Sequence, residues 1–128
     1  MEFAIETERL TGGYGATIVL RSLSLNVPRG SIFGFLGPNG AGKTTAIRML
    51  LGLLRPVSGV VRLFGEPVPH ALPGILRRVG SLIEQPSLYE HLTGRENLEI
   101  ARRRRRAFWS GRSFAIVGNA GLFSTVAA

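Results

Sequence analysis

The chain's clearest capacity for chemistry lies in nine consecutive residues, Gly37-Pro38-Asn39-Gly40-Ala41-Gly42-Lys43-Thr44-Thr45. The glycines permit backbone angles that a Cβ would forbid, so successive N–H groups can converge on phosphate oxygens. Lys43 would reach the β- and γ-phosphates of a nucleotide, Thr44 would help to coordinate Mg²⁺, and Thr45 would contact the α-phosphate. The spacing Gly-x4-Gly-Lys-Thr is the complete Walker A pattern and predicts a phosphate-binding loop.

The segments on both sides of this loop have the composition that such a loop needs. Residues 31–36 form a compact apolar run, which is typical of a strand buried on both faces. Apolar residues then recur at helical spacing over 46–54 until Pro56. A strand before the loop and a helix after it separate a phosphate loop from a glycine-rich turn that merely precedes a lysine. The positive end of the helix dipole would add to the attraction for phosphate.

Other local patterns predict a mixture of strands and helices around this unit. Alternating or continuous apolar runs indicate strands at 3–7, 22–27, 60–64 and 79–83. A short helix is expected at 72–78, and a longer one at 93–101. Thr93 would be the N-cap of the longer helix, with Glu96 completing a capping box. The fold class predicted from these patterns is α/β.

Composition excludes several kinds of chemistry. The chain has no cysteine, so disulfide frameworks, zinc–thiolate sites and cysteine nucleophiles are excluded. All eight acidic residues are glutamate, and Lys43 is the only lysine among 16 basic residues. Chemistry that needs an aspartate must therefore borrow it from another chain or be absent. The N-terminus lacks the basic and apolar regions of a secretory signal, which favours a cytosolic location.

The positive charge is concentrated at the C-terminal end. Residues 1–100 carry a net charge of +2 and residues 101–128 carry +6, mostly from the run Arg102 to Arg106. With Phe108 and Trp109, this run could bind nucleic acid or anionic lipid as a basic interaction module. The favoured alternative is a frameshifted or degraded continuation, because isolated charge runs are usually solvated. Nucleic acid is therefore not an expected partner.

Four further segments have a specific order and spacing along the chain. They are Phe33-Gly34-Phe35-Leu36, Ile47-Arg48-Met49-Leu50-Leu51-Gly52-Leu53, Pro56-Val57-Ser58-Gly59-Val60-Val61 and Thr93-Gly94-Arg95-Glu96-Asn97-Leu98. With the loop, they make residues 1–101 resemble the N-terminal part of an ABC transporter ATP-binding subunit. The segments at 56–61 and 79–98 disfavour a small P-loop kinase. The resemblance implies an incomplete P-loop NTPase fold of the ABC ATPase type, with an antiparallel β-subdomain plus the P-loop strand and helix. Residues 102–128 would then be a separate tail, either frameshifted or unstructured.

The resemblance also implies roles for residues outside the loop. Tyr14 would be the aromatic residue that stacks on adenine, and Val19 would line the same apolar surface. Glu84 occupies the position of the Q-loop glutamine, which contacts Mg²⁺ and the attacking water. A glutamate there resembles exporters of the bacitracin-resistance and lantibiotic-immunity type. The expected cofactors are ATP and Mg²⁺, with Thr44 and Glu84 as metal ligands; the alternative for Glu84 is a solvated charge at a strand end.

Three other parts of the family's hydrolytic machinery have no counterpart in these 128 residues. The family uses a Leu-Ser-Gly-Gly-type signature, an apolar strand ending in Asp-Glu and a switch histidine, and none of them is found. We therefore expect no ATP turnover from this chain alone. The complete protein would form a homodimer or heterodimer with a second ATPase subunit. It would work with a transmembrane permease on the inner face of the cell membrane and power export of a peptide antibiotic or similar cargo. A non-functional truncated gene product stays as the alternative.

Overall fold

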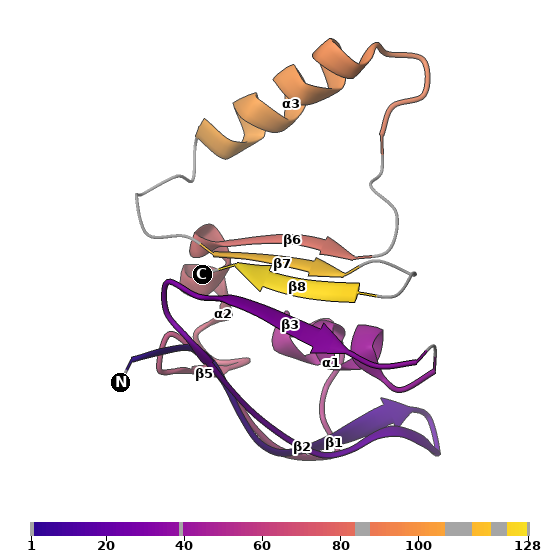
Figure 1. Cartoon of the computed structure of the whole chain (residues 1–128), viewed down its shortest axis with the longest axis vertical. Coiled ribbons are helices and arrows are strands. Elements are labelled where there is room, and N and C mark those ends of the chain that lie inside the picture. Colours follow the sequence, from indigo (N-terminus) through magenta and orange to yellow (C-terminus); the bar gives the residue numbers. More distant parts are fainter. Residues whose placement is uncertain (1, 39, 84–87, 107–113, 119–122, 128) are drawn as a thin grey trace.

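The computed structural model describes residues 2–38, 40–83, 88–106, 114–118 and 123–127. Its elements are β1 (Phe3–Tyr14), β2 (Thr17–Pro28), β3 (Ile32–Leu36), α1 (Lys43–Leu50), β4 (Ser58–Leu63), β5 (Glu66–Val68), α2 (Leu72–Ile75), the 3-10 turn η1 (Leu76–Arg78), β6 (Val79–Ile83), α3 (Gly94–Arg106), β7 (Phe114–Gly118) and β8 (Phe123–Ala127). The strands form two four-stranded sheets, and α1 lies between them (Figure 1).

The first sheet has strand order β2-β1-β4-β5 and is antiparallel throughout. It begins with a long hairpin of β1 and β2, in which Tyr14 pairs with Thr17 at the tip. Both pairings of β1 shift register near Arg9, whose φ of 45° marks a bulge. The sheet turns one face toward α1, so the hairpin tip is carried to the side of that helix (Figure 1).

The second sheet has strand order β3-β8-β7-β6 and is mixed. β8 pairs antiparallel with both β3 and β7, whereas β7 and β6 are parallel. Residues 102–106 continue α3, and β7 and β8 come from the segment after the arginine run. The division of the chain at residue 101 stays a prediction.

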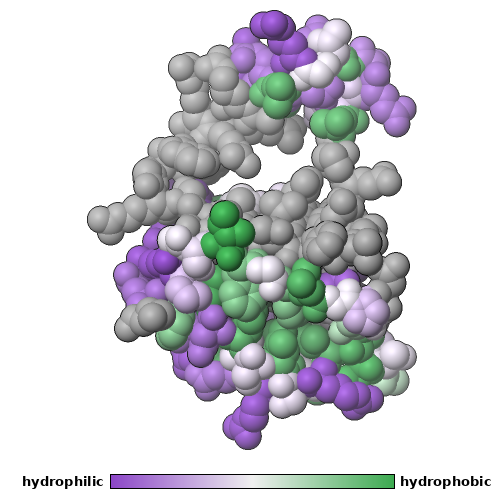
Figure 2. Space-filling view, viewed as in Figure 1, coloured by the Kyte–Doolittle hydropathy of each residue, from purple (hydrophilic) through white to green (hydrophobic). Residues whose placement is uncertain are grey.

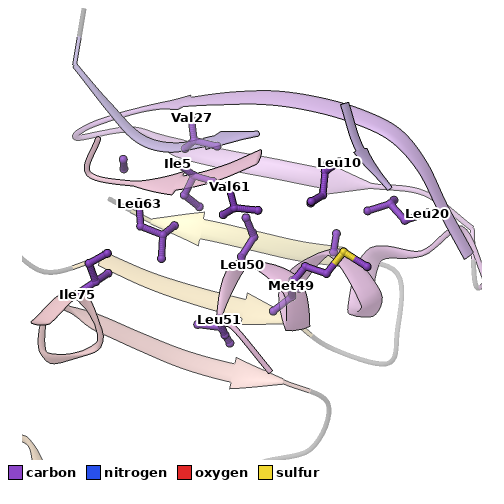
Figure 3. Packing of buried hydrophobic residues seen from close by; sticks show 13 residues of the cluster. Ile5, Leu10, Leu20, Val27, Met49, Leu50, Leu51, Val61, Leu63 and Ile75 are labelled. Atoms are coloured by element: carbon purple, nitrogen blue, oxygen red, sulfur yellow. The ribbon is translucent and has the colours of Figure 1, made fainter. Parts of the chain in front are cut away.

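Helix α1 supplies much of the hydrophobic core. Ile47, Met49 and Leu50 are at most 4% exposed. They pack with side chains of β1, β2 and β4, and Figure 3 shows Leu50 and Met49 pointing into this cluster. Burying each aliphatic side chain of this size stabilises the fold by about 1.5–3 kcal/mol. The buried hydrophobic residues of the cluster are Ala4, Ile5, Leu10, Leu20, Val27, Ala46, Ile47, Met49, Leu50, Leu51, Val61, Leu63 and Ile75.

Strand β3 differs from its prediction. Phe33 and Phe35 pack against the core on one face, but Ile32 is 83% exposed and Leu36 is 63% exposed on the other. The expectation of burial on both faces is therefore wrong for β3. The physical reason is that α1 and the first sheet cover one face, whereas no other described element covers Ile32 and Leu36.

The remaining helices lie outside the core cluster, apart from Ile75 of α2. Helix α3 stands apart from the sheets in Figure 1, and Figure 2 shows mostly hydrophilic side chains over it. At its start, the Thr93 N–H and hydroxyl donate to Glu96 Oε2 at 2.7 and 2.8 Å. The Glu96 N–H donates to the Thr93 hydroxyl at 3.3 Å, which confirms the predicted capping box. Among the described residues, no helix combines the length and apolar character needed to cross a membrane.

Most predicted elements are present, with changed bounds. Strand β6 has the predicted ends, while β1 and β2 extend the predicted strands to 12 residues each. Helix α1 begins at Lys43, directly after the loop residue Gly42 and three residues before the apolar run that predicted it. It ends at Leu50, where the chain turns through Gly52 (φ 68°). The α/β class and the antiparallel sheet beside a P-loop strand and helix are confirmed.

Replacing Gly59 by alanine should destabilise the fold by about 3 kcal/mol. Gly59 has a φ of 91°, and a Cβ there would lie 2.5 Å from the carbonyl oxygen of Arg9 in β1. Gly65 is the matched control, because its φ is 81° but a Cβ would meet no atom within 4 Å. Gly65→Ala should cost only about 1 kcal/mol. Urea unfolding measures both, and equal losses would contradict the close approach of β4 to β1.

The capping box should make α3 sensitive to acid. The Thr93 backbone N–H, and second its hydroxyl, hold the pKa of Glu96 below its usual range by bonding to the carboxylate. The stabilisation by the Glu96 carboxylate is complete above the pKa of glutamate in the unfolded chain, about 4.3. It is lost as the pH falls through the lowered pKa of the folded state. The Thr93 amide proton shift, followed by NMR, should titrate below 4.3. Glu96→Gln should abolish this titration and Glu66→Gln should preserve it. A titration midpoint at or above about pH 4.3 would contradict the lowered pKa of Glu96.

Candidate phosphate-binding site

The candidate site is the turn between β3 and α1. β3 ends at Leu36 and α1 starts at Lys43, so the nine-residue motif spans the loop and the first helical turn. The Ala41 N–H donates to the Pro38 carbonyl at 3.1 Å, which closes a tight turn inside the loop. Asn39 lies outside the described residues. The chain therefore places the other motif residues where a strand end turns directly into a helix.

Gly42 is the N-cap of α1 and determines how the loop enters the helix. Its φ of 92° and ψ of 12° are left-handed, and a Cβ would lie 3.3 Å from Leu20 Cδ1 and 3.4 Å from the Val19 carbonyl oxygen. No side chain caps the helix, and its first turn holds no acidic residue. The N–H groups of the first turn thus have no carboxylate competing for them, which suits an anion at this end.

Lys43 folds back over the loop. Its ammonium donates to the carbonyl oxygens of Gly37 and, at 3.4 Å, of Pro38. Only 9% of the residue is exposed, so the cation is held within the loop rather than extended into water. Because a phosphate oxygen is a stronger acceptor for an ammonium than a carbonyl, a phosphate in this loop would take over these hydrogen bonds.

The two threonines occupy the first turn of α1. Thr45 is buried at 5% exposure, while Thr44 is partly buried. A partly buried hydroxyl beside Lys43 fits the predicted role of Thr44 toward a phosphate-bound Mg²⁺. Glu84, the other predicted metal ligand, lies outside the described residues. Among the residues that are described, no group of three or more histidine or glutamate side chains gathers around a possible cation.

Tyr14 is brought to the same helix from the first sheet. It lies at the tip of the β1–β2 hairpin and is 44% exposed. An Arg48 guanidinium nitrogen donates to the Tyr14 hydroxyl at 2.7 Å, so the ring is tied to α1. Val19 is partly buried in β2, and its carbonyl passes beside Gly42. Tyr14, the predicted aromatic residue, and the predicted phosphate-binding loop therefore both lie at α1.

Sequence reasoning missed Arg48. One signal for it was present, because Arg48 follows Lys43 by five positions and lies between the apolar residues Ile47 and Met49. On a helix whose neighbouring residues are buried, a long cationic side chain there must extend along the surface toward a neighbouring element. That the neighbour would be Tyr14, 34 positions earlier, could not be predicted from local patterns.

A strand, a glycine-rich loop and a helix with this lysine geometry define a protein of the P-loop class. The sequence model of the ABC transporter family matches residues 20–122. The chain therefore belongs to the ABC transporter family, and the part that it covers is from the family's ATP-binding domain.

Similar curated proteins include two bacitracin transport ATP-binding proteins named BcrA, from Enterococcus faecalis and Bacillus licheniformis. Each is 52% identical over 100 residues, which is 78% of this chain and 32% or 33% of the relative. The daunorubicin/doxorubicin resistance ATP-binding protein DrrA of Streptomyces peucetius is 45% identical over 107 residues, 84% of this chain and 32% of that protein. The chain thus spans about a third of the length of the curated relatives it matches.

Solved structures agree on the fold. An ATP-binding subunit of an ABC transporter superposes with a TM-score of 0.62 at 33% identity, over 80% of this chain and 42% of that one. A bacterial Atm1-family ABC exporter with ATP bound has a TM-score of 0.59 at 23% identity, over 70% of this chain and 16% of that one. The predicted ABC ATPase fold and family resemblance are confirmed.

Lys43→Met should leave the fold intact, with a change in unfolding free energy below about 1 kcal/mol. The variant removes a mostly buried cation, and the carbonyls that it leaves belong to Gly37 and Pro38, which are partly or fully exposed to water. Thermal unfolding measures the change, with Arg103→Met on α3 as the control for loss of one positive charge. A loss of several kcal/mol would mean that Lys43 holds the loop together.

Proposed function

We propose that this chain binds ATP with Mg²⁺ at Gly37–Thr45. The observation that carries the proposal is the Lys43 ammonium, which is held over the loop at an uncapped helix N-terminus. Backbone N–H groups of the loop would bind phosphate oxygens, and Lys43 would neutralise the β- and γ-phosphates. Thr44 and Thr45 would contact Mg²⁺ and the α-phosphate, respectively. The membership of the chain in the ABC transporter family supports ATP as the nucleotide.

The base would stack on Tyr14. The ring is partly exposed at the hairpin tip and is tied to the same helix that begins at Lys43. Stacking accepts a flat base without a hydrogen-bond pattern, so triphosphate recognition would come from the loop and the base would add affinity. Bound Mg²⁺ would supply charge neutralisation between phosphate oxygens, with Thr44 as a protein ligand and Glu84 as a second one.

For the complete protein, we propose ATP-driven export by an ABC transporter. Two relatives are named for bacitracin transport and share 52% identity with this chain, which supports a peptide antibiotic or similar cargo. The protein would dimerise with a homologous ATPase subunit around two ATP molecules. It would work with a transmembrane permease at the inner face of the cell membrane. Because this chain covers about a third of those relatives, these activities belong to the whole protein.

Hydrolysis needs groups that these residues do not contain. The family anchors its metal through an aspartate at a strand end, and there is no aspartate among the 128 residues. A carboxylate that positions the attacking water and a partner-facing signature are likewise required. We therefore propose binding without turnover as the activity of this chain taken alone.

Isothermal titration with ATP–Mg²⁺ tests the binding proposal. Lys43→Met should weaken binding by at least about ten-fold, because charged hydrogen bonds to phosphate each contribute about 1.5–3 kcal/mol. Tyr14→Ala should weaken binding of ATP by about ten-fold, through the lost stacking, while leaving Mg²⁺–tripolyphosphate unaffected. Arg103→Met is the control for charge and should bind like the parent chain. Equal affinity of Lys43→Met and the parent chain for ATP would contradict the proposed binding of ATP at this loop.

A further inference from the structure

The contact between Arg48 and Tyr14 joins the two halves of the proposed nucleotide site. An Arg48 guanidinium nitrogen donates to the Tyr14 hydroxyl at 2.7 Å, and the guanidinium carbon lies 5.9 Å from the ring centroid. Arg48 belongs to α1, which starts at the phosphate loop, whereas Tyr14 belongs to the tip of the β1–β2 hairpin. Arg48 itself lies outside the Walker A motif, which ends at Thr45.

The guanidinium meets the edge of the ring rather than its face. A comparison within the same chain shows the difference, because Arg78 stacks over Phe64 with its guanidinium carbon 3.8 Å from the centroid. At 5.9 Å, with a hydrogen bond to the hydroxyl, Arg48 holds the outer end of the Tyr14 ring. The ring is also 44% exposed. An aromatic ring held at its hydroxyl keeps its faces available for stacking.

Both ends of this contact rest on packed structure. Ile47 and Met49, on either side of Arg48, are 2% and 1% exposed. On the hairpin, a Cβ at Gly12 would overlap the Met49 side chain, so the β1 backbone approaches α1 closely two residues before Tyr14. The hydrogen bond therefore joins two elements that the core already holds together.

We propose that Arg48 is a positioning residue that holds the Tyr14 ring at a fixed distance from the phosphate loop, so that α1 determines the spacing between base and phosphates. The role rests on the proposed binding of ATP. Arg48 follows Lys43 by five positions, which corresponds to a rise of about 7.5 Å along a helix. The expected ligand class is therefore a nucleoside triphosphate, with its phosphates at the start of α1 and its base at the Tyr14 ring that Arg48 holds. Free polyphosphate would bind only at the start of α1.

The test compares two ligands, ATP–Mg²⁺ and Mg²⁺–tripolyphosphate, by isothermal titration on the full chain. Arg48→Met should weaken ATP binding by about three- to ten-fold, because the ring must then be ordered on binding, and it should leave tripolyphosphate binding unchanged. Tyr14→Phe removes only the hydroxyl and should match Arg48→Met. The double variant should be no weaker than Arg48→Met alone, since Arg48→Met already removes the hydrogen bond that Tyr14→Phe removes. Arg48→Lys, which keeps a donor, should recover part of the loss.

Matched controls separate positioning from charge. Arg103→Met also removes one arginine and should leave both affinities unchanged. Equal weakening of ATP and tripolyphosphate by Arg48→Met would make Arg48 a general cation for phosphates and overturn the positioning role. Parent-like ATP binding by Arg48→Met would overturn this role while leaving the proposed function in place. A parent chain that binds tripolyphosphate but not ATP would overturn the base site and this inference together.

A spectroscopic measurement tests the contact without nucleotide. The chain has two tyrosines, so Tyr89→Phe leaves Tyr14 as the one site for 3-fluorotyrosine. In that background, Arg48→Met should move the ¹⁹F resonance of Tyr14 toward that of free fluorotyrosine, and Arg103→Met should not. An unchanged resonance in Arg48→Met would show that Arg48 does not hold the ring, which also overturns the proposal.

Discussion

The burial of helix α1 is the constraint on which the rest of the site depends. The helix has eight residues and no side-chain cap, so its local signals are weak. An isolated helix of this length is marginal in water. Packing between two sheets must therefore stabilise it, and six of its residues are buried: Lys43, Thr45, Ala46, Ile47, Met49 and Leu50. The core therefore holds the helix into which the phosphate loop leads.

The feature that weakens α1 as a helix also makes it suitable for binding. A side-chain cap would satisfy N–H groups of the first turn and leave fewer of them for an anion. Gly42 contributes no such cap, and its left-handed angles bring the loop close to β2. The first sheet therefore supplies the stability that the N-terminus of α1 does not supply itself. Because the sheet stabilises this end of the helix, the N–H groups of the first turn can stay available for a phosphate without loss of the fold.

Patterns within short stretches of the sequence correctly predicted those features that depend only on residues close in sequence. The Walker A spacing, the apolar run of β6 and the Thr93–Glu96 capping box all depend on residues close in sequence, and each is present. The prediction that Tyr14 lies near the nucleotide came from family resemblance and not from these local patterns. Its actual partner, Arg48, is 34 positions away and belongs to another element. A contact of that kind depends on how a hairpin and a helix pack, which no window of sequence contains.

Strand pairing shows the same limit. The apolar run of 31–36 predicted the strand, but not its neighbour, because β8 comes from the far end of the chain. Nor could the run show which of its faces would be covered. Phe33 and Phe35 meet the core, whereas Ile32 and Leu36 have the same apolar character and are exposed. Hydrophobicity identifies residues able to be buried, but the number of packed layers decides which of them are.

The two cationic side chains of α1 are not interchangeable, although both lie on one helix. Lys43 must curl into a narrow loop and offer a compact ammonium to several oxygens, which a planar guanidinium does less well. Arg48 instead reaches across to a ring edge, where a flat fork of donors can hold a hydroxyl in a defined direction. In a chain with 16 basic residues, the only lysine is at the loop. The difference in shape between the two cations therefore separates the proposed phosphate contact from the proposed positioning of the base.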